Sequence, residues 1–195
     1  MVKMCTIVYN CTHCTHNCTN VYNSIKKEYL PFNCQIQGGG FSVMFWGVFS
    51  IWGFGSLVAL EGTQNQHTYV ELLKEYLVPE INFARDKLKI ELQFMQDNAP
   101  CHKTKKVDNF FSTHSIEVLD WPAQSPDLNP IENIWNIIKF RRKKKFGFPR
   151  TKEELIDQIF EIWNSLEEDL CHSCIGSMEN RLNEVLRLQG RSIGY

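Results

Sequence analysis

Two carboxylates have the residue type and the placement to do chemistry, Asp97 and Glu132, with 34 residues between them. Asp97 follows a strand-like run over 89–95, and Glu132 stands in the first turn of a helix that is predicted to begin at Pro130. Ligands of open α/β sheets bind just outside the carboxyl ends of strands, and hard divalent cations prefer oxygen ligands. Two such ions held about 4 Å apart activate a nucleophile and stabilise the leaving oxygen in phosphoryl transfer. The pair therefore predicts a metal site of this kind.

Each acid also has a plainer structural interpretation. Asn129 is suited to cap the helix, the proline after it fits the first helical position, and Glu132 could return a hydrogen bond to the Asn129 amide. Asp97 could be an ordinary turn residue at a strand end. Asp120 and Asp127 lie in the same stretch and are alternative metal ligands.

The elements that must position these acids follow from the hydrophobic pattern. A chain of 195 residues with 43% hydrophobic content can bury one substantial core, which predicts a single domain. Alternating β-rich runs and amphipathic segments indicate an α/β fold. Strands are predicted over 38–50, 51–62, 89–95 and 116–119, and helices over 66–81, 103–113, 130–146, 151–166 and 167–188.

A run of bases follows Glu132 along the same predicted helix. The formal net charge of the chain is −1, so positive charge is local rather than general. DNA phosphates would neutralise such a run, but a solvated helix end explains it as well, because cations are favourable near a helix C-terminus. The run puts six bases into seven positions: Lys139, Arg141, Arg142, Lys143, Lys144 and Lys145.

Residues 1–20 differ from the rest of the chain. They contain four cysteines, two histidines and no acidic residue, so zinc ligation is conceivable, but no second ligand cluster lies nearby. A poorly ordered leader over 1–20, followed by one domain over 21–195, is the favoured division. No apolar run is long enough to span a membrane and the first ten residues do not form a signal peptide, so an intracellular protein with reduced thiols is expected.

Several remaining residues are predicted to serve structure rather than chemistry. His102 could approach the site of Asp97, although a local hydrogen bond at a helix start is the favoured interpretation. Cys101 is predicted to be a small buried filler. Further core residues are predicted at Trp46, Trp121, Trp135, Cys171 and Cys174.

Three motifs in order carry a family resemblance. QDNAPCH at 96–102, DWPAQSPDLNPIENIW at 120–135 and the upstream pattern GGG..VM.WG.FS resemble the catalytic domain of mariner-type transposases, in the branch whose third acid is glutamate. The resemblance covers about 29–195. It implies a ribonuclease H-like fold: a mixed β-sheet flanked by helices, with a helical C-terminal region that includes SMENRL at 177–182.

The same resemblance implies function. It implies DNA strand cleavage and joining at transposon ends that depends on Mg²⁺ or Mn²⁺, with Asp97 as the second catalytic acid and Glu132 as the third. It favours DNA contact by the basic run, gives DNA rather than a membrane as the partner and leaves a homodimer open. The nucleus or the cytoplasm is the expected location.

The departures from the family pattern concern the first acid. Members carry it on the first strand, in a Ser-Asp-Glu motif upstream of the triple glycine. Here no aspartate precedes Asp86, the only acid before Glu61 is Glu28, and residues 1–20 offer only TIVYN as a strand-like fragment. The family's N-terminal helix-turn-helix region is also missing from the sequence. These departures predict a truncated domain that holds one ion at best, performs no strand transfer and cleaves little or no DNA. The alternative is a non-catalytic DNA-binding or protein-interaction protein that retains the fold.

Overall fold

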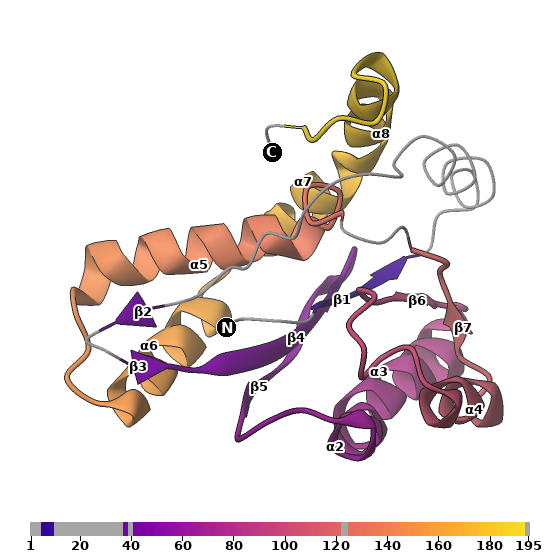
Figure 1. The fold of residues 1–195 in the computed structure, drawn as a ribbon, viewed down its shortest axis with the longest axis horizontal. Coiled ribbons are helices and arrows are strands. Elements are labelled where there is room, and N and C mark those ends of the chain that lie inside the picture. The colour runs from indigo at the N-terminus through magenta and orange to yellow at the C-terminus, as the bar shows by residue number, and fades with distance from the viewer. Residues whose placement is uncertain (1–4, 10–36, 39–40, 122–124, 194–195) are drawn as a thin grey trace.

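The sheet at the centre of the molecule has five strands. A computed structural model describes residues 5–9, 37–38, 41–121 and 125–193, the segments 5–9, 37–38 and position 41 by their backbone alone. The strand order is β5-β4-β1-β6-β7, and a two-stranded ribbon of β2 and β3 stands apart (Figure 1). The strands are β1 (Cys5–Tyr9), β2 (Gln37–Gly38), β3 (Phe41–Ser42), β4 (Met44–Ser50), β5 (Gly53–Leu60), β6 (Gln93–Met95) and β7 (Glu117–Val118).

Strand directions make the sheet mixed. β1 runs parallel to β4 and antiparallel to β6, while β4 and β5 form an antiparallel hairpin and β6 and β7 are parallel. The strands predicted over 38–50 and 51–62 thus form a hairpin. A mixed sheet flanked by helices confirms the fold class predicted from the sequence.

β1 occupies the middle of the sheet. Its sequence CTIVY holds four β-branched or aromatic residues in a row, the composition that favours a pleated strand. The strand-like fragment of the leader is thus a strand, whereas the rest of 1–20 lies outside the described residues. The division of the chain at residue 20 stays a prediction.

Helices cover both faces of the sheet (Figure 1). One face carries α2 (Gln66–Leu72), the π-helical turn η1 (Leu73–Leu77), α3 (Val78–Phe83), a second π-helical turn η2 (Ala84–Leu88) and α4 (Lys105–Thr113). The other face carries α5 (Pro130–Phe146), α6 (Lys152–Asn164) and α7 (Glu168–Gly176), and α8 (Met178–Arg187) continues from α7. None of the described helices is long and apolar enough to cross a membrane.

Alternating side chains of β4 supply both cores. Phe45 and Phe49 pack with α5, α6 and α7, and Trp46 and Val48 pack with α2 to α4. Gly47 lies between them where Trp163 comes close: a Cβ at this position would stand 3.0 Å from the Trp163 ring. Glycine is therefore required for α6 to approach the sheet this closely.

Several predicted boundaries move. The helix predicted over 66–81 extends to Leu88 and ends at Lys89, whose φ of 58° is left-handed. The predicted strand over 89–95 consequently shortens to Gln93–Met95. The C-terminal segment divides into α7 and α8 around Ser177.

The predicted packing residues are mostly buried. Trp46, Trp135, Cys171 and Cys174 lie in the cores, as predicted, and burial raises the pKa of the Cys171 thiol to about 12. Trp121 is only partly buried.

Candidate active site

Asp97 lies two residues beyond the end of β6, next to the central strand. Its Oδ1 accepts a hydrogen bond from the Ala99 amide at 3.0 Å, which closes a turn. The side chain is 36% exposed, so solvent and ligands reach it. The strand end thus presents a carboxylate in a fixed orientation.

The buried side chain of His102 contacts the Asp97 carboxylate. Its Nδ1 lies 2.7 Å from Asp97 Oδ1, and its ring is 1% exposed and stacked on Tyr69 with 4.1 Å between ring centroids. Tyr69 in turn donates a hydrogen bond from its hydroxyl to Gln96 Oε1 at 2.6 Å. The local hydrogen bond predicted for His102 is confirmed, and its partner is the candidate metal ligand itself.

The environment of His102 favours its charged form. Burial alone lowers the pKa of His102, but hydrogen bonds with Asp97 and Cys101 and the negative charge of Asp97 outweigh it and raise the pKa from 6.5 to about 9. The hydrogen bond to His102 lowers the pKa of the Cys101 thiol. Cys101 is only partly buried, so the prediction of a buried filler is wrong.

Glu132 projects from the first turn of α5 towards the same place. Burial, and to a smaller extent the negative charge of Asp97, together raise the pKa of the Glu132 carboxyl from 4.5 to about 7. No residue that the structure describes donates a hydrogen bond to this carboxylate. The structure therefore brings the two predicted acids within electrostatic reach of each other.

The capping arrangement predicted for Glu132 is not formed. Asn129 is the N-cap by its backbone, yet its side chain makes no capping hydrogen bond, and its buried Oδ1 finds no partner among the described residues. The Asn129 amide, which Glu132 was expected to bond, donates instead to Pro126 O at 3.1 Å. The plainer interpretation of Glu132 is therefore wrong, because the turn before the helix already uses that amide.

The loop that leads to Glu132 is anchored by the C-terminal helix. Arg181, only 1% exposed, donates from Nη1 to Asp127 O at 2.8 Å, and the Ile193 amide donates to Asp127 Oδ2 at 3.0 Å. Leu128 packs against Val185 and Ile193. Asp127, which the sequence offered as an alternative metal ligand, thus accepts the hydrogen bonds that anchor this loop.

Sequence reasoning missed the role of Arg181. The signal was available, because this arginine stands inside SMENRL, one of the segments that carry the resemblance. Asp120, the other alternative ligand, is exposed. Asn98 links the two halves of the site by donating from Nδ2 to the Trp121 carbonyl at 2.6 Å.

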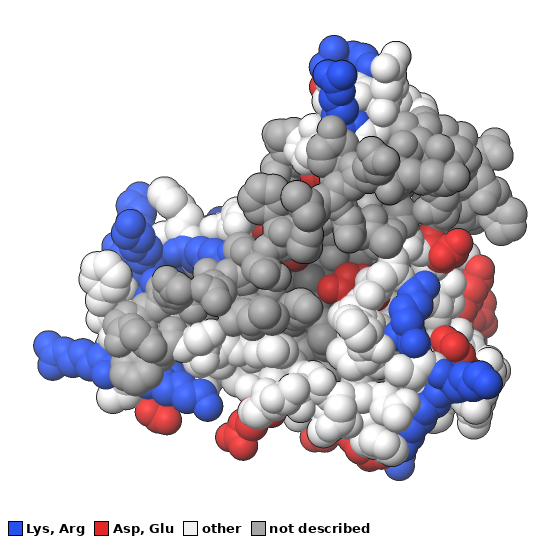
Figure 2. All heavy atoms as spheres, in the orientation of Figure 1, with Lys and Arg blue, Asp and Glu red and all other residues white. Residues whose placement is uncertain are grey.

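The electrostatics fit a bound cation. A half-buried carboxylate that lacks a hydrogen-bond donor and faces a second carboxylate is unstable as an anion, and a divalent cation with oxygen preference relieves both effects. Figure 2 shows acidic side chains in a hollow near the middle of one face. Within the described part of the chain, no three acid, histidine or cysteine side chains form a metal-binding group. Metal binding by Asp97 and Glu132 stays a prediction.

Three of the six bases in the run are engaged by contacts within the protein. Arg141 pairs with Glu167 at 3.0 Å and Lys145 with Glu161 at 2.6 Å, while Arg142 is 4% exposed. Arg142 donates from Nη1 to Gly147 O at 3.1 Å and to Gln158 Oε1 at 3.3 Å, and burial lowers its pKa.

The other three bases of the run are differently placed. Lys143 and Lys144 are exposed, whereas burial lowers the pKa of Lys139. Lys139 and Lys143 follow Glu132 by seven and eleven residues, so they lie on the face of α5 that carries this acid. Phosphate contact by the run stays a prediction, now centred on these lysines.

Comparisons with known proteins agree with this geometry. The profile of a family described as DDE superfamily endonuclease matches residues 53–156, just over half of the chain. The chain is 33% identical over 181 residues to the transposable element Tc3 transposase of Caenorhabditis elegans, covering 91% of this chain and 53% of that protein. It is 32% identical over 173 residues to the Tcb1 transposase of Caenorhabditis briggsae, covering 88% and 62%. The chain thus spans between half and two thirds of these relatives.

Solved structures show the same fold. The Mos1 transposase catalytic domain, solved with raltegravir and Mn, superposes with a TM-score of 0.73 at 17% identity, over 95% of this chain and all of that one. A Mos1 paired-end complex with the left transposon end gives a TM-score of 0.71 at 16% identity, over 98% of this chain and 55% of that one. The fold is therefore ribonuclease H-like, and the chain belongs to the DDE superfamily endonucleases, in the Tc1/mariner group of transposases.

Proposed function

We propose that this chain is a transposase catalytic domain whose ancestral role is metal-dependent cleavage and joining of transposon-end DNA, and which keeps only part of its metal site. The observation that carries the proposal is Glu132, a carboxylate with a raised pKa that lies beside Asp97 and accepts no hydrogen bond from the described residues. Such a group is costly in a folded protein unless a cation uses it.

Mg²⁺ or Mn²⁺ is the proposed cofactor, with Asp97 and Glu132 as its protein ligands. The Mos1 transposase catalytic domain, which has a similar fold, was solved with Mg and with Mn. When bound, such an ion lowers the pKa of a coordinated water and stabilises charge on phosphate oxygens. The chain's own part is to orient the ligands: His102 and the Ala99 amide fix Asp97, and Arg181 fixes the loop that delivers Glu132.

The site lacks a carboxylate from the central strand. Ile7 pairs with Met95 in the antiparallel ladder of β1 and β6, so continuing that register by two residues puts Cys5 opposite Asp97. β1 has the sequence CTIVY, without an acid at any position. Two carboxylates hold one divalent ion weakly, and two-metal phosphoryl transfer requires a second. We propose that the chain is inactive in strand transfer and cleaves DNA little or not at all.

DNA of transposon ends is the proposed partner. Relatives are transposases by name, and a neighbouring structure is a paired-end complex with a transposon end. Lys139 and Lys143 extend from Glu132 along α5, which would place phosphates near the acids. A homodimer and a nuclear location belong to the same proposal.

A metal-dependent nicking assay tests it. Supercoiled DNA carrying the element's ends is incubated with the protein and Mg²⁺ or Mn²⁺, with Glu132→Ala as the control. No nicking above the control is expected. Nicking by the unchanged chain that vanishes in Glu132→Ala would contradict the loss of activity.

A second function is favoured by the acid-free central strand: a DNA-binding or protein-interaction protein that retains the fold. Binding measurements in EDTA discriminate it. Metal-free binding to DNA that is unaffected by Asp97→Asn and Glu132→Gln would support this second function.

A further inference from the structure

One phenylalanine in the second half of α5 and another two residues beyond its end are the most exposed large hydrophobic residues in the described part of the chain. Phe140 is 68% exposed and Phe148 is 74% exposed. The core face of α5 is formed by other positions, among them Ile138, so Phe140 lies on the opposite side of the helix. These rings contribute nothing to the cores.

The turn that presents Phe148 is held firmly. Gly147 ends the helix with a φ of 74°, a conformation that favours glycine, and its carbonyl accepts a hydrogen bond from the buried Arg142 at 3.1 Å. Pro149 is buried, and the Arg150 amide donates to Glu154 Oε2 at 2.7 Å. Phe148 is therefore displayed by a rigid turn, so a partner that covers it pays little to order it.

Exposed cations stand close to the two phenylalanines in the sequence. Lys144 follows Phe140 by four residues, which places it one helical turn away on the same face, and Lys143 and Arg150 are also exposed. We call these five residues the α5-end patch: Phe140, Lys143, Lys144, Phe148 and Arg150. Figure 2 shows lysine and arginine side chains gathered over this end of α5.

The neighbouring acids do not neutralise the patch. Glu167 pairs with Arg141 and Glu161 pairs with Lys145, so these two acids are engaged by other members of the basic run. The described residues offer no ion pair to Lys143 or Lys144. Positive charge and exposed aromatic faces therefore occur together in this segment.

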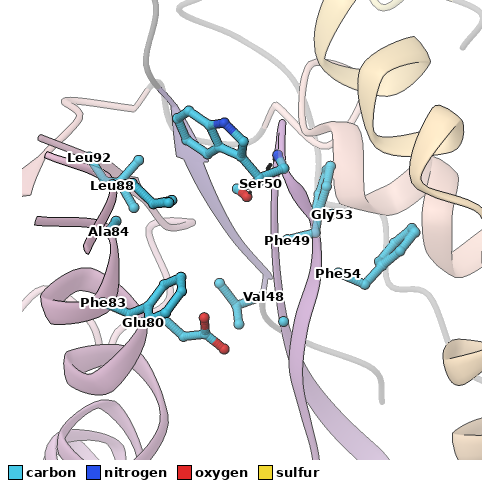
Figure 3. A pocket seen from close by; sticks show the side chains of 12 residues that line it. Val48, Phe49, Ser50, Gly53, Phe54, Glu80, Phe83, Ala84, Leu88 and Leu92 are labelled. Atoms are coloured by element: carbon cyan, nitrogen blue, oxygen red, sulfur yellow. Dashed lines mark hydrogen bonds between the residues drawn. The ribbon is translucent and has the colours of Figure 1, made fainter. Parts of the chain in front are cut away.

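Two other exposed apolar side chains line a cavity. Phe83 and Leu88 are 56% and 43% exposed, and they line a cavity of about 170 Å³ that also contains the carboxylate of Glu80 (Figure 3). No lysine or arginine is among the described residues that line it. That cavity suits an apolar ligand rather than an anion, and it provides a control surface.

We propose that the α5-end patch binds unpaired DNA, with bases stacked on Phe140 and Phe148 and phosphates at Lys143, Lys144 and Arg150. Aromatic side chains bind single strands by stacking on base faces, which a duplex hides, and cations supply the sequence-independent attraction to phosphate. The identity of DNA as the partner rests on the proposed function. The inference adds that the DNA beyond the two acids is bound as a single strand.

Fluorescence anisotropy with two labelled probes tests the inference on the full chain. One probe is an oligothymidylate of roughly 20 nucleotides, and the other is a mixed-sequence duplex of the same length. Phe140→Ala/Phe148→Ala is expected to weaken single-strand binding roughly tenfold or more while leaving duplex affinity within about twofold. Lys143→Gln/Lys144→Gln should weaken both probes and reduce the slope of log affinity against log salt by about 1 to 2.

The comparison variant is Phe83→Ala/Leu88→Ala, which removes two less exposed apolar side chains from the cavity that contains the Glu80 carboxylate. It should leave both affinities unchanged. Single-strand affinity that is the same in Phe140→Ala/Phe148→Ala and in the unchanged chain would overturn the inference. So would an equal loss for both probes, because a duplex offers no base faces to stack.

Two further outcomes separate the alternatives. If the phenylalanine variant alters only the sedimentation coefficient and not DNA binding, the patch is an interface between copies and the inference fails. If single-strand binding depends on the phenylalanines but no divalent metal binds at Asp97 and Glu132, the patch stands and the proposed metal site fails.

Discussion

Replacing Glu132 by glutamine should stabilise the metal-free protein at alkaline pH. The Glu132 carboxyl has a pKa of about 7 in the folded protein, whereas the pKa of an unperturbed glutamate is 4.5. A raised acid pKa means that the folded state binds the proton more tightly than the unfolded state, so stability falls as pH rises between these values. A difference of about 2.5 pKa units corresponds to about 3 kcal/mol of destabilisation once Glu132 is ionised.

Glutamine removes that charge and keeps the shape. The substitution also removes a favourable interaction of about 0.3–1 kcal/mol between the acid and the N-terminus of α5, which leaves a net gain of about 2 kcal/mol. For a domain of this size, that gain raises Tm by about 4–8 °C. The gain should be present at about pH 8.5 and disappear near about pH 4.5, below which Glu132 is protonated in both states.

The assay is urea unfolding followed by tryptophan fluorescence, in EDTA, at both pH values. Trp135 and Trp163 are stacked in the core beneath α5, with 5.9 Å between ring centroids, and report the transition. Glu153→Gln is the matched control, because Glu153 is an exposed acid in the first turn of α6. With saturating Mn²⁺ the order should reverse, since only the unchanged chain gains stability from the metal. A variant that is no more stable at alkaline pH, or equally stabilised at both pH values, would refute the reasoning.

Three other perturbations have defined outcomes. Arg181→Met removes the donor to Asp127 O and should cost about 2–3 kcal/mol of unfolding free energy, and a smaller Mn²⁺-induced rise in Tm than in the unchanged chain would show that this arginine positions Glu132. Gly47→Ala puts a Cβ 3.0 Å from the Trp163 ring, so chemical denaturation should show a loss of about 1–3 kcal/mol, and an unchanged midpoint would mean that α6 shifts freely. Arg142→Met should lower Tm more than Lys144→Met does, because Arg142 is buried and bonded to Gly147 O whereas Lys144 is exposed; equal effects would contradict the structural role.

The sequence predicted the parts of the site that depend on local patterns. Asp97 at a strand end and Glu132 in a first helical turn follow from strand and helix signals that lie within a few residues of each acid. The fold class followed from motifs in order. The sheet brings these two acids together, and only the resemblance to the family predicted that they share one site.

The remaining features depend on partners far apart in sequence. The ion pair of Arg141 needs Glu167, 26 residues away, so charge spacing alone could not reveal which bases of the run are already engaged. The anchor of the Glu132 loop joins Arg181 to Asp127, 54 residues apart. The capping prediction was wrong for a local reason. The Asn129 amide donates its hydrogen bond to the Pro126 carbonyl, three residues earlier, and is therefore not available to Glu132.

The place of β1 could not be read from composition. Its five residues are strand formers, but the cysteine-rich segment around them suggested a separate leader. Tertiary pairing with β4 and β6 decides its position, and such pairing is only weakly specified by a short strand.

The stoichiometry of Mn²⁺ binding tests the central claim most directly. Free Mn²⁺ is counted by electron paramagnetic resonance during titration of the full chain and of its Asp97→Asn and Glu132→Gln variants. One weakly bound ion per chain is expected, and it should be lost in both variants. Two bound ions in the unchanged chain, or one ion that survives both substitutions, would contradict that claim.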